Sequence, residues 1–347
     1  MTTFAIIGTG WRSAFFCRLA RMAPDRFRVV GVVSRSRDEF EGVPVFRTVD
    51  ELPRSDFVIV SVPWAVAPDA TRSLVARGVR VLVETPPAPD LDGLRALWAD
   101  VGASRLVQVA EQYLLMPGHA ARLTAVGDGT IGEPTSVQVS STHLYHAVSM
   151  IRGLLGVGFE PARVTARAFS ALLADPVSFD GWHGDVEPRE RRTTLATLDF
   201  GTRMGLYDFT DNQWWNPLRT RRIVVRGTTG ELVDDALVRL ADPRTVVESH
   251  LIYRRTGIDL NLEGSDLDHI SLDGRVLWRN PFFGARFSED DLGVAMLLAA
   301  TGAWARDEGP EPYPLAEGLQ DHCLSVAIGE ALATGQDVDT GVEPWAT

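Results

Sequence analysis

Ile6-Ile7-Gly8-Thr9-Gly10-Trp11-Arg12-Ser13 follows the first strand-like run of the chain, Phe4–Ile7, and leads into the amphipathic stretch Arg12–Met22. The form is Gly-x-Gly-x-x-small at the junction of a strand and a helix. Gly8 allows a tight turn, Gly10 lets a diphosphate approach the backbone, and Ser13 stands where helix and strand pack closely. Phosphates would bind the N–H groups at the helix start. The alternative is a glycine turn that binds no ligand. The motif predicts a dinucleotide site formed by Gly8, Thr9, Gly10, Trp11, Arg12 and Ser13.

Short β-branched runs alternate with longer amphipathic runs through the first hundred-odd residues. Strand, helix and strand at this spacing predict a doubly wound parallel sheet with helices on both faces. The expected strands are Phe4–Ile7, Val29–Ser34, Phe57–Val62, Val79–Glu84 and Leu106–Val109, and the expected helices are Arg12–Met22, Pro68–Ala76 and Leu91–Val101.

Beyond about residue 120 the strand candidates become longer and alternate between apolar and polar residues. A chain of 347 residues also exceeds what one hydrophobic core usually supports. We therefore expect an α/β protein with a dinucleotide-binding domain over residues 1–120 and a substrate and oligomerisation domain of α+β type over residues 121–347, built on a mostly antiparallel sheet. Its expected strands are Thr135–Ser141, Arg163–Phe169, Arg192–Phe200, Met204–Phe209 and Arg221–Arg226, and its expected closing helices are Leu292–Trp304 and Ala316–Ala333.

The composition excludes several classes of function. The formal net charge of −12 argues against a nucleic acid or an anionic membrane as partner, because both need a basic face. All 34 basic residues are arginine, so no lysine ammonium is available for acid–base or Schiff-base chemistry. The two cysteines, Cys17 and Cys323, fit neither a disulfide framework nor a multi-cysteine metal site. The sequence carries no secretory signal or membrane-length apolar run, so we expect a cytoplasmic protein.

The end of the second strand indicates which dinucleotide binds. An NAD site normally places an acidic residue there, whereas an NADP site uses small polar and basic residues. Here the strand ends Val33-Ser34-Arg35-Ser36-Arg37, and the first acid is Asp38. Ser34, Arg35 and Arg37 suit a 2′-phosphate, so NADP is preferred over NAD; the alternative is a solvated loop.

Further short motifs follow the glycine turn in a fixed order. They are Val60-Ser61-Val62-Pro63-Trp64, Gly78-Val79-Arg80-Val81-Leu82-Val83-Glu84-Thr85-Pro86, His146-Ala147-Val148-Ser149, Val225-Arg226-Gly227-Thr228-Thr229-Gly230-Glu231-Leu232, and the last helix from Gly318 to Gly335. With these motifs the chain resembles the Gfo/Idh/MocA oxidoreductases, the glucose–fructose oxidoreductase and inositol dehydrogenase superfamily, from end to end.

The resemblance implies an N-terminal Rossmann domain and a C-terminal domain with a large open sheet. The active site would lie between the two domains, and the open sheet would form the interface of a homo-oligomer, a dimer or tetramer. A small-molecule substrate and a nicotinamide dinucleotide are implied as ligands. Cofactor contacts are implied for Val62, Pro63, Trp64, Glu84, Thr85 and Pro86.

The catalytic residues depart from the family pattern. Glu-Lys-Pro appears as Glu84-Thr85-Pro86, which removes the lysine that normally touches the nicotinamide ribose and the substrate hydroxyl. Thr142 stands where the family has aspartate four residues before the histidine His146, and Ser149 stands at a second aspartate position. Trp64 and Ala67 replace the usual asparagine and histidine. Because alcohol oxidation needs a base, these changes imply an altered catalytic set.

His146 and its neighbours are the expected replacement for that set. Histidine suits acid–base chemistry near neutral pH, so we expect His146 to be catalytic with Tyr145 as a second candidate, and His143 to bind substrate. Structural roles are the alternatives. Trp214 and Trp215, among aspartate and asparagine residues, indicate a sugar-like or aromatic substrate, although an interface or core packing also explains them. No spacing resembles a zinc or calcium site, so no metal is expected.

Two hypotheses follow. In the first, the protein is an oxidoreductase, NADP- or NAD-dependent, that acts on a small sugar-like, carbonyl or imine substrate. In the second, it binds the dinucleotide without net redox turnover, as a regulator or in a redox-neutral elimination or epimerisation. The glycine turn fits both hypotheses, whereas Thr85 and Thr142 favour the second.

Overall fold

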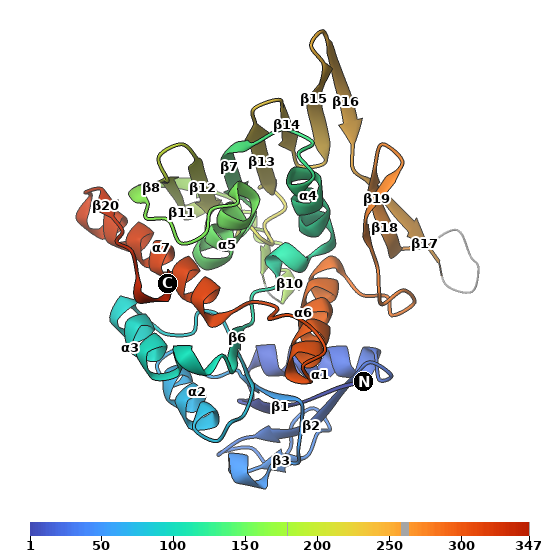
Figure 1. Cartoon of the computed structure of the whole chain (residues 1–347), viewed down its shortest axis with the longest axis vertical. Coiled ribbons are helices and arrows are strands. Elements are labelled where there is room, and N and C mark those ends of the chain that lie inside the picture. The colour runs from blue at the N-terminus through green and yellow to red at the C-terminus, as the bar shows by residue number, and fades with distance from the viewer. Residues whose placement is uncertain (179, 258–263, 347) are drawn as a thin grey trace.

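A computed structural model describes residues 1–178, 180–257 and 264–346. Figure 1 shows a parallel sheet at one end of the molecule and a much larger sheet at the other, with helices between and around them. The predicted fold class, α/β with a parallel and a mostly antiparallel sheet, is confirmed. None of the helices in the described residues is long and apolar enough to cross a bilayer.

The N-terminal sheet has the strand order β3-β2-β1-β4-β5-β6, and every pair in it is parallel. Its central strands are short runs of valine, isoleucine and phenylalanine that are buried on both faces, as a sheet covered by helices on both sides requires. The strands are β1 (Thr2–Ile7), β2 (Phe27–Val33), β3 (Val45–Phe46), β4 (Phe57–Val60), β5 (Val81–Val83) and β6 (Val107–Val109), and the helices are α1 (Trp11–Met22), α2 (Ala67–Val75) and α3 (Leu91–Val101).

The order of the strands reverses between β1 and β4. In a doubly wound sheet, ligands bind outside the carboxyl ends of the strands at such a point. The residues that follow β1, β4, β5 and β6 therefore define the edge where a site is expected. Phe4 of β1 and Phe57 of β4 stack with ring centroids 5.6 Å apart and fix the two strands beneath this edge.

The second sheet has the order β16-β15-β14-β13-β7-β12-β11-β8-β20 and is antiparallel except between β12 and β7. Helices α5 and α7 pack on one of its faces. Its strands are β7 (Pro134–Ser140), β8 (Arg163–Leu173), β11 (Arg189–Asp199), β12 (Met204–Thr210), β13 (Arg222–Gly227), β14 (Gly230–Val233), β15 (Ala236–Asp242), β16 (Thr245–His250) and β20 (Val338–Asp339), and the helices are α5 (Leu144–Leu155) and α7 (Leu315–Thr334).

The remaining elements connect and extend these sheets. A small sheet pairs β17 (Ile252–Thr256), β18 (Asp266–Leu272) and β19 (Arg275–Arg279), and β9 (Val177–Ser178) pairs β10 (Gly181–Trp182). The other helices are α4 (Pro117–Gly127), α6 (Glu289–Ala305) and the 3₁₀ turns η1 (Val49–Glu51), η2 (Gly102–Ser104), η3 (Tyr113–Leu115) and η4 (Pro344–Ala346).

The chain crosses between its two parts more than once. Helix α4 spans the boundary expected at residue 120. Helix α6 returns to the parallel sheet and packs on β1, where a Cβ on Gly302 would lie 2.3 Å from the Thr2 hydroxyl oxygen. The two parts are thus joined by packing as well as by the chain.

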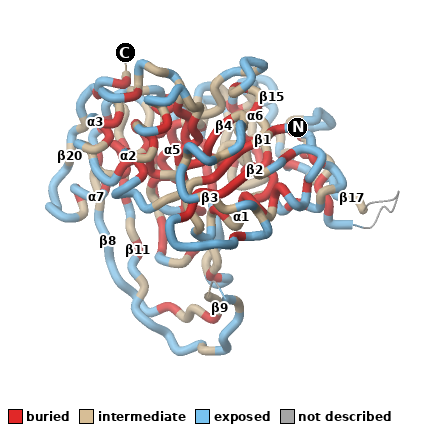
Figure 2. The backbone as a smooth tube through the Cα atoms, turned by 90° about the horizontal axis from the view of Figure 1, so that it is seen from below, coloured by how far each residue is buried: buried red, intermediate tan, exposed pale blue. Residues whose placement is uncertain are grey.

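Strands β8 and β11 form a long hairpin that leaves the body of the molecule. Figure 2 shows both strands running out to an exposed tip that carries β9. Their pairing continues from Val164 opposite Leu198 to Leu173 opposite Arg189. We call the described residues 170–178 and 180–192 the arm.

Candidate active site

The glycine turn has the geometry that the motif predicts. Gly8 has φ of +114°, and a Cβ there would lie 2.0 Å from the carbonyl oxygen of Ser61, just beyond β4. Only glycine fits this position, because a side chain would be strained by the backbone and blocked by Ser61. The Gly8 N–H donates to the Val33 carbonyl at 3.1 Å. The turn therefore ties together the carboxyl ends of β1, β2 and β4.

The start of α1 suits a negatively charged group. Gly10 is the N-cap, no side chain of the described chain caps the helix, and its first turn holds no acidic residue. A Cβ on Gly10 would meet no atom within 4 Å, so open space lies in front of the turn. Unpaired N–H groups and the helix dipole favour an anion at such a helix end. Trp11 is 67% exposed beside this space, and Ser13 is buried against the sheet. The residues present fit a dinucleotide diphosphate.

The loop after β2 is organised around a buried hydroxyl. Ser34 is buried, and its hydroxyl accepts the Arg37 N–H at 3.1 Å. Arg47 donates to the carbonyls of Ser34 at 3.0 Å and of Arg37 at 2.8 Å, and pairs with Asp38. Arg35 and Arg37 are exposed, and within the described chain neither side chain has an ion-pair partner. Their guanidinium groups are available at the position where a ribose would lie.

Arg12 and Glu84 form a shielded ion pair at the edge of the sheet. Arg12 Nε lies 2.8 Å from Glu84 Oε1, with the two side chains 11% and 17% exposed. Arg12 also donates from Nη2 to Gln112 Oε1 at 3.0 Å. Burial alone would lower the pKa of Arg12, but Glu84 beside it raises that pKa above its ordinary value. The Arg12 side chain is thus committed to Glu84, and what it offers a phosphate is its backbone N–H.

The other residues of the Glu-Thr-Pro and Val-Pro-Trp motifs surround this pair and the turn. The Thr85 N–H donates to Glu84 Oε2 at 3.3 Å, and Pro86 is buried. Val62 Cγ1 would lie 3.3 Å from a Cβ on Gly8, which places it against the turn. Pro63 is exposed and Trp64 is 56% exposed at the same strand end.

His146 forms a close pair with Glu111, a residue that sequence reasoning missed. Glu111 follows β6, and its Oε2 lies 2.5 Å from Nδ1 of His146, in the first turn of α5. The carboxylate is fully buried and the imidazole is 12% exposed. Because an ionised carboxylate only accepts, Nδ1 carries the proton and Nε2 is left as the basic nitrogen. Within the described residues, no group hydrogen-bonds Nε2.

The pair is fixed by its surroundings. The Tyr113 N–H donates to Glu111 Oε1 at 2.8 Å, and the Tyr113 ring stacks on His146 with centroids 4.4 Å apart. Gln112, between Glu111 and Tyr113 in sequence, holds Arg12 at the start of α1. Three consecutive residues after β6 thus connect the histidine to the glycine turn.

His143 contacts the His146 ring, and Trp214 in turn contacts His143. The His143 ring is 5.2 Å from the His146 ring and 5.2 Å from Trp214. The crowded rings desolvate His143, and together with the neighbouring His146 they lower its pKa to about 4. His143 is therefore neutral at pH 7. Its position beside His146 agrees with contact to a substrate rather than with proton transfer.

Tyr145 is placed differently from His146. It is 5% exposed, and its hydroxyl lies 2.9 Å from where a Cβ on Gly318 of α7 would stand. Burial raises the pKa of Tyr145 well above its ordinary value. This packing on α7 gives no support to the catalytic role expected for Tyr145. Ser149, at the second lost aspartate position, donates to the His146 carbonyl at 2.9 Å.

Trp215 contacts Trp214 edge to face, with ring centroids 4.6 Å apart. It lines a polar pocket of about 140 Å³ at the base of the arm. Across the described residues, no group of three or more histidine, cysteine or carboxylate side chains is placed to hold a metal ion.

A turn that fits a diphosphate, linked through Gln112 to the buried pair of Glu111 with His146, agrees with a dinucleotide-binding oxidoreductase. Residues 2–113 match the sequence model of the Gfo/Idh/MocA family, described as an oxidoreductase family with an NAD-binding Rossmann fold. This match covers the N-terminal third of the chain and agrees with the family resemblance found in the sequence. No curated protein matches the sequence.

Solved structures of the same fold span the whole chain. A myo-inositol dehydrogenase from Corynebacterium glutamicum is 17% identical, with 98% of this chain and 99% of that chain covered and a TM-score of 0.64. A levoglucosan dehydrogenase in complex with NADH and levoglucosan is 16% identical, with 97% and 99% covered and a TM-score of 0.67. The WlbA dehydrogenase from Bordetella pertussis, in complex with NADH and UDP-GlcNAcA, is 16% identical, with 99% of both chains covered and a TM-score of 0.61.

Proposed function

We propose that this protein is an NAD(P)-dependent oxidoreductase that interconverts an alcohol and a carbonyl on a small, polyhydroxylated molecule. The observation that carries the proposal is the 2.5 Å contact between His146 Nδ1 and buried Glu111 at the edge of the dinucleotide-binding sheet. The named structural neighbours act on or bind inositol, levoglucosan and a sugar nucleotide. That chemistry supports a hydroxylated substrate over an imine.

When bound, the dinucleotide would supply or accept a hydride at its nicotinamide ring. The chain's part is to bind it at the glycine turn and to move a proton. Glu111 holds the Nδ1 proton of His146, so that Nε2 faces outward as a base. During oxidation Nε2 takes the hydroxyl proton as the carbon–hydrogen bond breaks, and during reduction the imidazolium returns it to the carbonyl oxygen. Glu111 stabilises the imidazolium, and it takes the role of the family's aspartate, whose position is occupied by Thr142 in this chain.

The test is a hydride-transfer assay on the purified protein. NADPH and NADH binding is measured first, by calorimetry. Cyclitols, monosaccharides, their keto forms and simple imines are then screened by absorbance at the nicotinamide band. Turnover of a hydroxylated or keto substrate is the expected result. Tight binding of the dinucleotide with no turnover in any class would instead support the hypothesis of a protein without net redox turnover, which the missing lysine at Thr85 favours.

Arg35 provides a test of dinucleotide choice. We propose that NADP is preferred, because Arg35 and Arg37 are exposed and unpaired beside Ser34, whereas Asp38 is held by Arg47. A charge-assisted hydrogen bond contributes about 1.5–3 kcal/mol, so Arg35→Ala is expected to weaken NADPH binding about 10- to 100-fold. NADH binding should change less than threefold. Calorimetric titration with both dinucleotides measures the two affinities.

Arg28→Ala is the matched control for this prediction. Arg28 is an exposed arginine near the opposite end of β2, so its loss should affect neither dinucleotide. Equal losses of NADPH and NADH affinity in Arg35→Ala would show that the 2′-phosphate lies elsewhere.

Association into a dimer or tetramer stays a prediction. Phe169 of β8 and Leu195 of β11 are 53% and 43% exposed, on the sheet face that carries neither α5 nor α7. Exposed apolar side chains on an uncovered sheet face favour association. Light scattering of the purified protein measures its mass in solution.

A further inference from the structure

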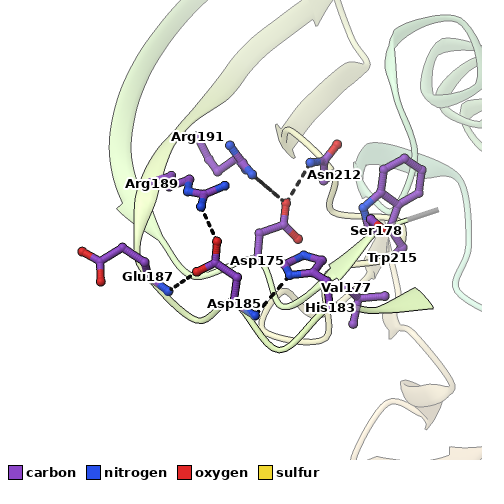
Figure 3. Close-up of a pocket in the computed structure, with 10 residues that line it drawn as sticks. All are labelled: Asp175, Val177, Ser178, His183, Asp185, Glu187, Arg189, Arg191, Asn212 and Trp215. Carbon is purple, nitrogen blue, oxygen red and sulfur yellow. Dashed lines mark hydrogen bonds and ion pairs between the residues drawn. The ribbon is translucent and has the colours of Figure 1, made fainter. Parts of the chain in front are cut away.

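The pocket at the base of the arm is walled by charged and aromatic side chains. It has a volume of about 140 Å³ and is formed by the arm together with Asn212 and Trp215, which follow β12 (Figure 3). These parts are far apart in sequence. The long pairing of β8 with β11 brings the arm beside the segment after β12, since β12 is the other neighbour of β11.

Both arginines that line the pocket are paired with carboxylates, whereas the lining Glu187 has no ion pair within the described residues. Asp175 Oδ2 accepts from Arg191 Nη2 at 3.0 Å and from Asn212 Nδ2 at 2.8 Å, and the Asp175 side chain is only 8% exposed. Arg189 pairs with Asp185. Because both lining arginines are bound to carboxylates, the pocket offers no unpaired guanidinium to a phosphate or carboxylate. A neutral ligand fits it better than an anion.

Two buried polar atoms at the pocket have no partner in the described chain. They are Asp175 Oδ1, an acceptor, and Trp215 Nε1, a donor. Buried polar groups are otherwise almost always hydrogen-bonded, so an unmatched donor and acceptor in one pocket mark the chemistry of what fills it. A hydroxyl group accepts one bond and donates another, and therefore complements both atoms. The flat indole beside them suits the apolar face of a sugar or cyclitol ring.

A series of aromatic rings lies between the pocket and the pair formed by Glu111 and His146. Trp215 lies 4.6 Å from Trp214, Trp214 lies 5.2 Å from His143, and His143 lies 5.2 Å from His146. The rings of Trp215, Trp214, His143 and His146 are thus successive neighbours between the pocket and the Glu111–His146 pair. The row contains four rings, which is more than one sugar ring covers.

We propose that this pocket is a distal subsite for a neutral hydroxylated ring, and that the substrate is an extended glycoside or disaccharide rather than a single sugar. This inference rests on the proposed function, because only that function makes the ligand of the pocket a substrate. Asp175 Oδ1 accepts from a ring hydroxyl, and Trp215 Nε1 donates to one. The reacting carbon lies at the other end of the ligand, beside His146.

The test uses protein labelled with ¹⁵N in its tryptophan indoles. Monosaccharides, cyclitols, disaccharides and methyl glycosides are titrated into the protein with NADH bound, and the indole signal missing from Trp215→Phe identifies Trp215. At least one disaccharide or glycoside is expected to shift the Trp215 signal. Trp215→Phe keeps an aromatic ring, although a smaller one, and loses the N–H donor, and it should weaken binding of that compound at least fivefold.

Trp182→Phe is the control, because Trp182 is 76% exposed on the same arm and does not line the pocket. The affinity of Trp182→Phe for the same compound should stay within twofold of that of the parent protein. For a turned-over compound, Trp215→Phe should raise KM at least fivefold and leave kcat unchanged, with no effect on single-ring substrates.

The two proposals fail in different ways. A panel with no compound that shifts the Trp215 signal, or unchanged affinity in Trp215→Phe, would overturn the subsite even if hydride transfer is observed. A Trp215 response without hydride transfer for any compound would retain a binding pocket and overturn the proposed oxidoreductase function.

Discussion

Replacing His146 with asparagine is expected to lower kcat about 10²- to 10⁴-fold, the usual contribution of a positioned acid–base group. Asparagine preserves a polar side chain at this position but has no basic nitrogen to accept the substrate proton. NADPH and NADH affinities should stay within threefold, because in the described residues His146 is linked to the glycine turn indirectly, through Glu111 and Gln112. Steady-state kinetics on the substrate found in the screen, with calorimetry for the dinucleotides, measures both effects.

Chemical rescue separates a catalytic role from a structural one. His146→Ala leaves a space beside the Tyr113 ring, and added imidazole should restore part of the lost kcat in a concentration-dependent way. His143→Asn is the neighbouring control. His143 has its pKa lowered to about 4 by desolvation and by His146, so it is neutral at working pH and its loss should affect KM more than kcat. Activity of His146→Asn within threefold of the parent would refute the mechanism.

Glu111 acts through His146 and is a positioning residue. Glu111→Gln puts an amide opposite Nδ1, which removes the negative charge that stabilises the imidazolium. We expect kcat to fall about 10- to 100-fold with little change in KM. Glu111→Asp keeps the charge and should recover part of the loss. A purely structural role would predict equal losses of stability in both variants and no split between kcat and KM.

The first half of the fold could be predicted from the sequence because its signals are local. Strands such as Val81–Val83 are short apolar runs buried on both faces, and Leu91–Val101 is bounded by an N-cap aspartate at Asp90, so the predicted and observed limits agree closely. The signal of each of these elements lies within about ten residues. The glycine motif is equally local as a sequence pattern, although the need for glycine at Gly8 comes from Ser61, just beyond β4.

The features that were missed depend on distant partners. Glu111 lies in Ala110-Glu111-Gln112, which matches no motif, and its partner His146 is on an element 35 residues away. The available signal was its position directly after a buried strand, at the edge where ligands bind. The arm was also underestimated. Arg189–Arg191 is too polar to predict a strand, and it is extended because it pairs with β8.

Arg152→Met is expected to destabilise the protein by about 3–5 kcal/mol, the usual effect of removing one partner from a buried ion pair. Arg152 is 3% exposed on α5 and donates to Asp321 Oδ1 at 2.6 Å and to Glu317 Oε2 at 2.7 Å, both on α7. Tyr313 donates to Asp321 Oδ2 at 2.5 Å. Removal of the guanidinium leaves a fully buried carboxylate without its counter-charge. Urea unfolding followed by circular dichroism measures the loss.

The pH dependence of this loss follows from Asp321. Burial raises the pKa of Asp321 to about 6, against the opposing effect of Arg152. A folded-state pKa above the ordinary value of 3.8 means that the folded protein favours the protonated acid. The free energy of stabilisation that protonated Asp321 contributes is present in full below pH 3.8. It is lost as the pH rises through about 6. Without Arg152 the pKa rises further, so Arg152→Met should lose more stability at pH 8 than at pH 5.

Neutralising the remaining acid distinguishes buried charge from lost packing. In Arg152→Met/Asp321→Asn the amide needs no counter-charge and still accepts from Tyr313, so the double variant should recover more than half of the loss at pH 8. It should also lose the dependence on pH, because the titrating group is gone. Arg226→Met, which removes the partner of Glu231 from an exposed ion pair, should change the midpoint of urea unfolding little. If instead the double variant is as unstable as Arg152→Met at both pH values, packing between α5 and α7 accounts for the loss, and Arg152 serves chiefly as volume in that interface.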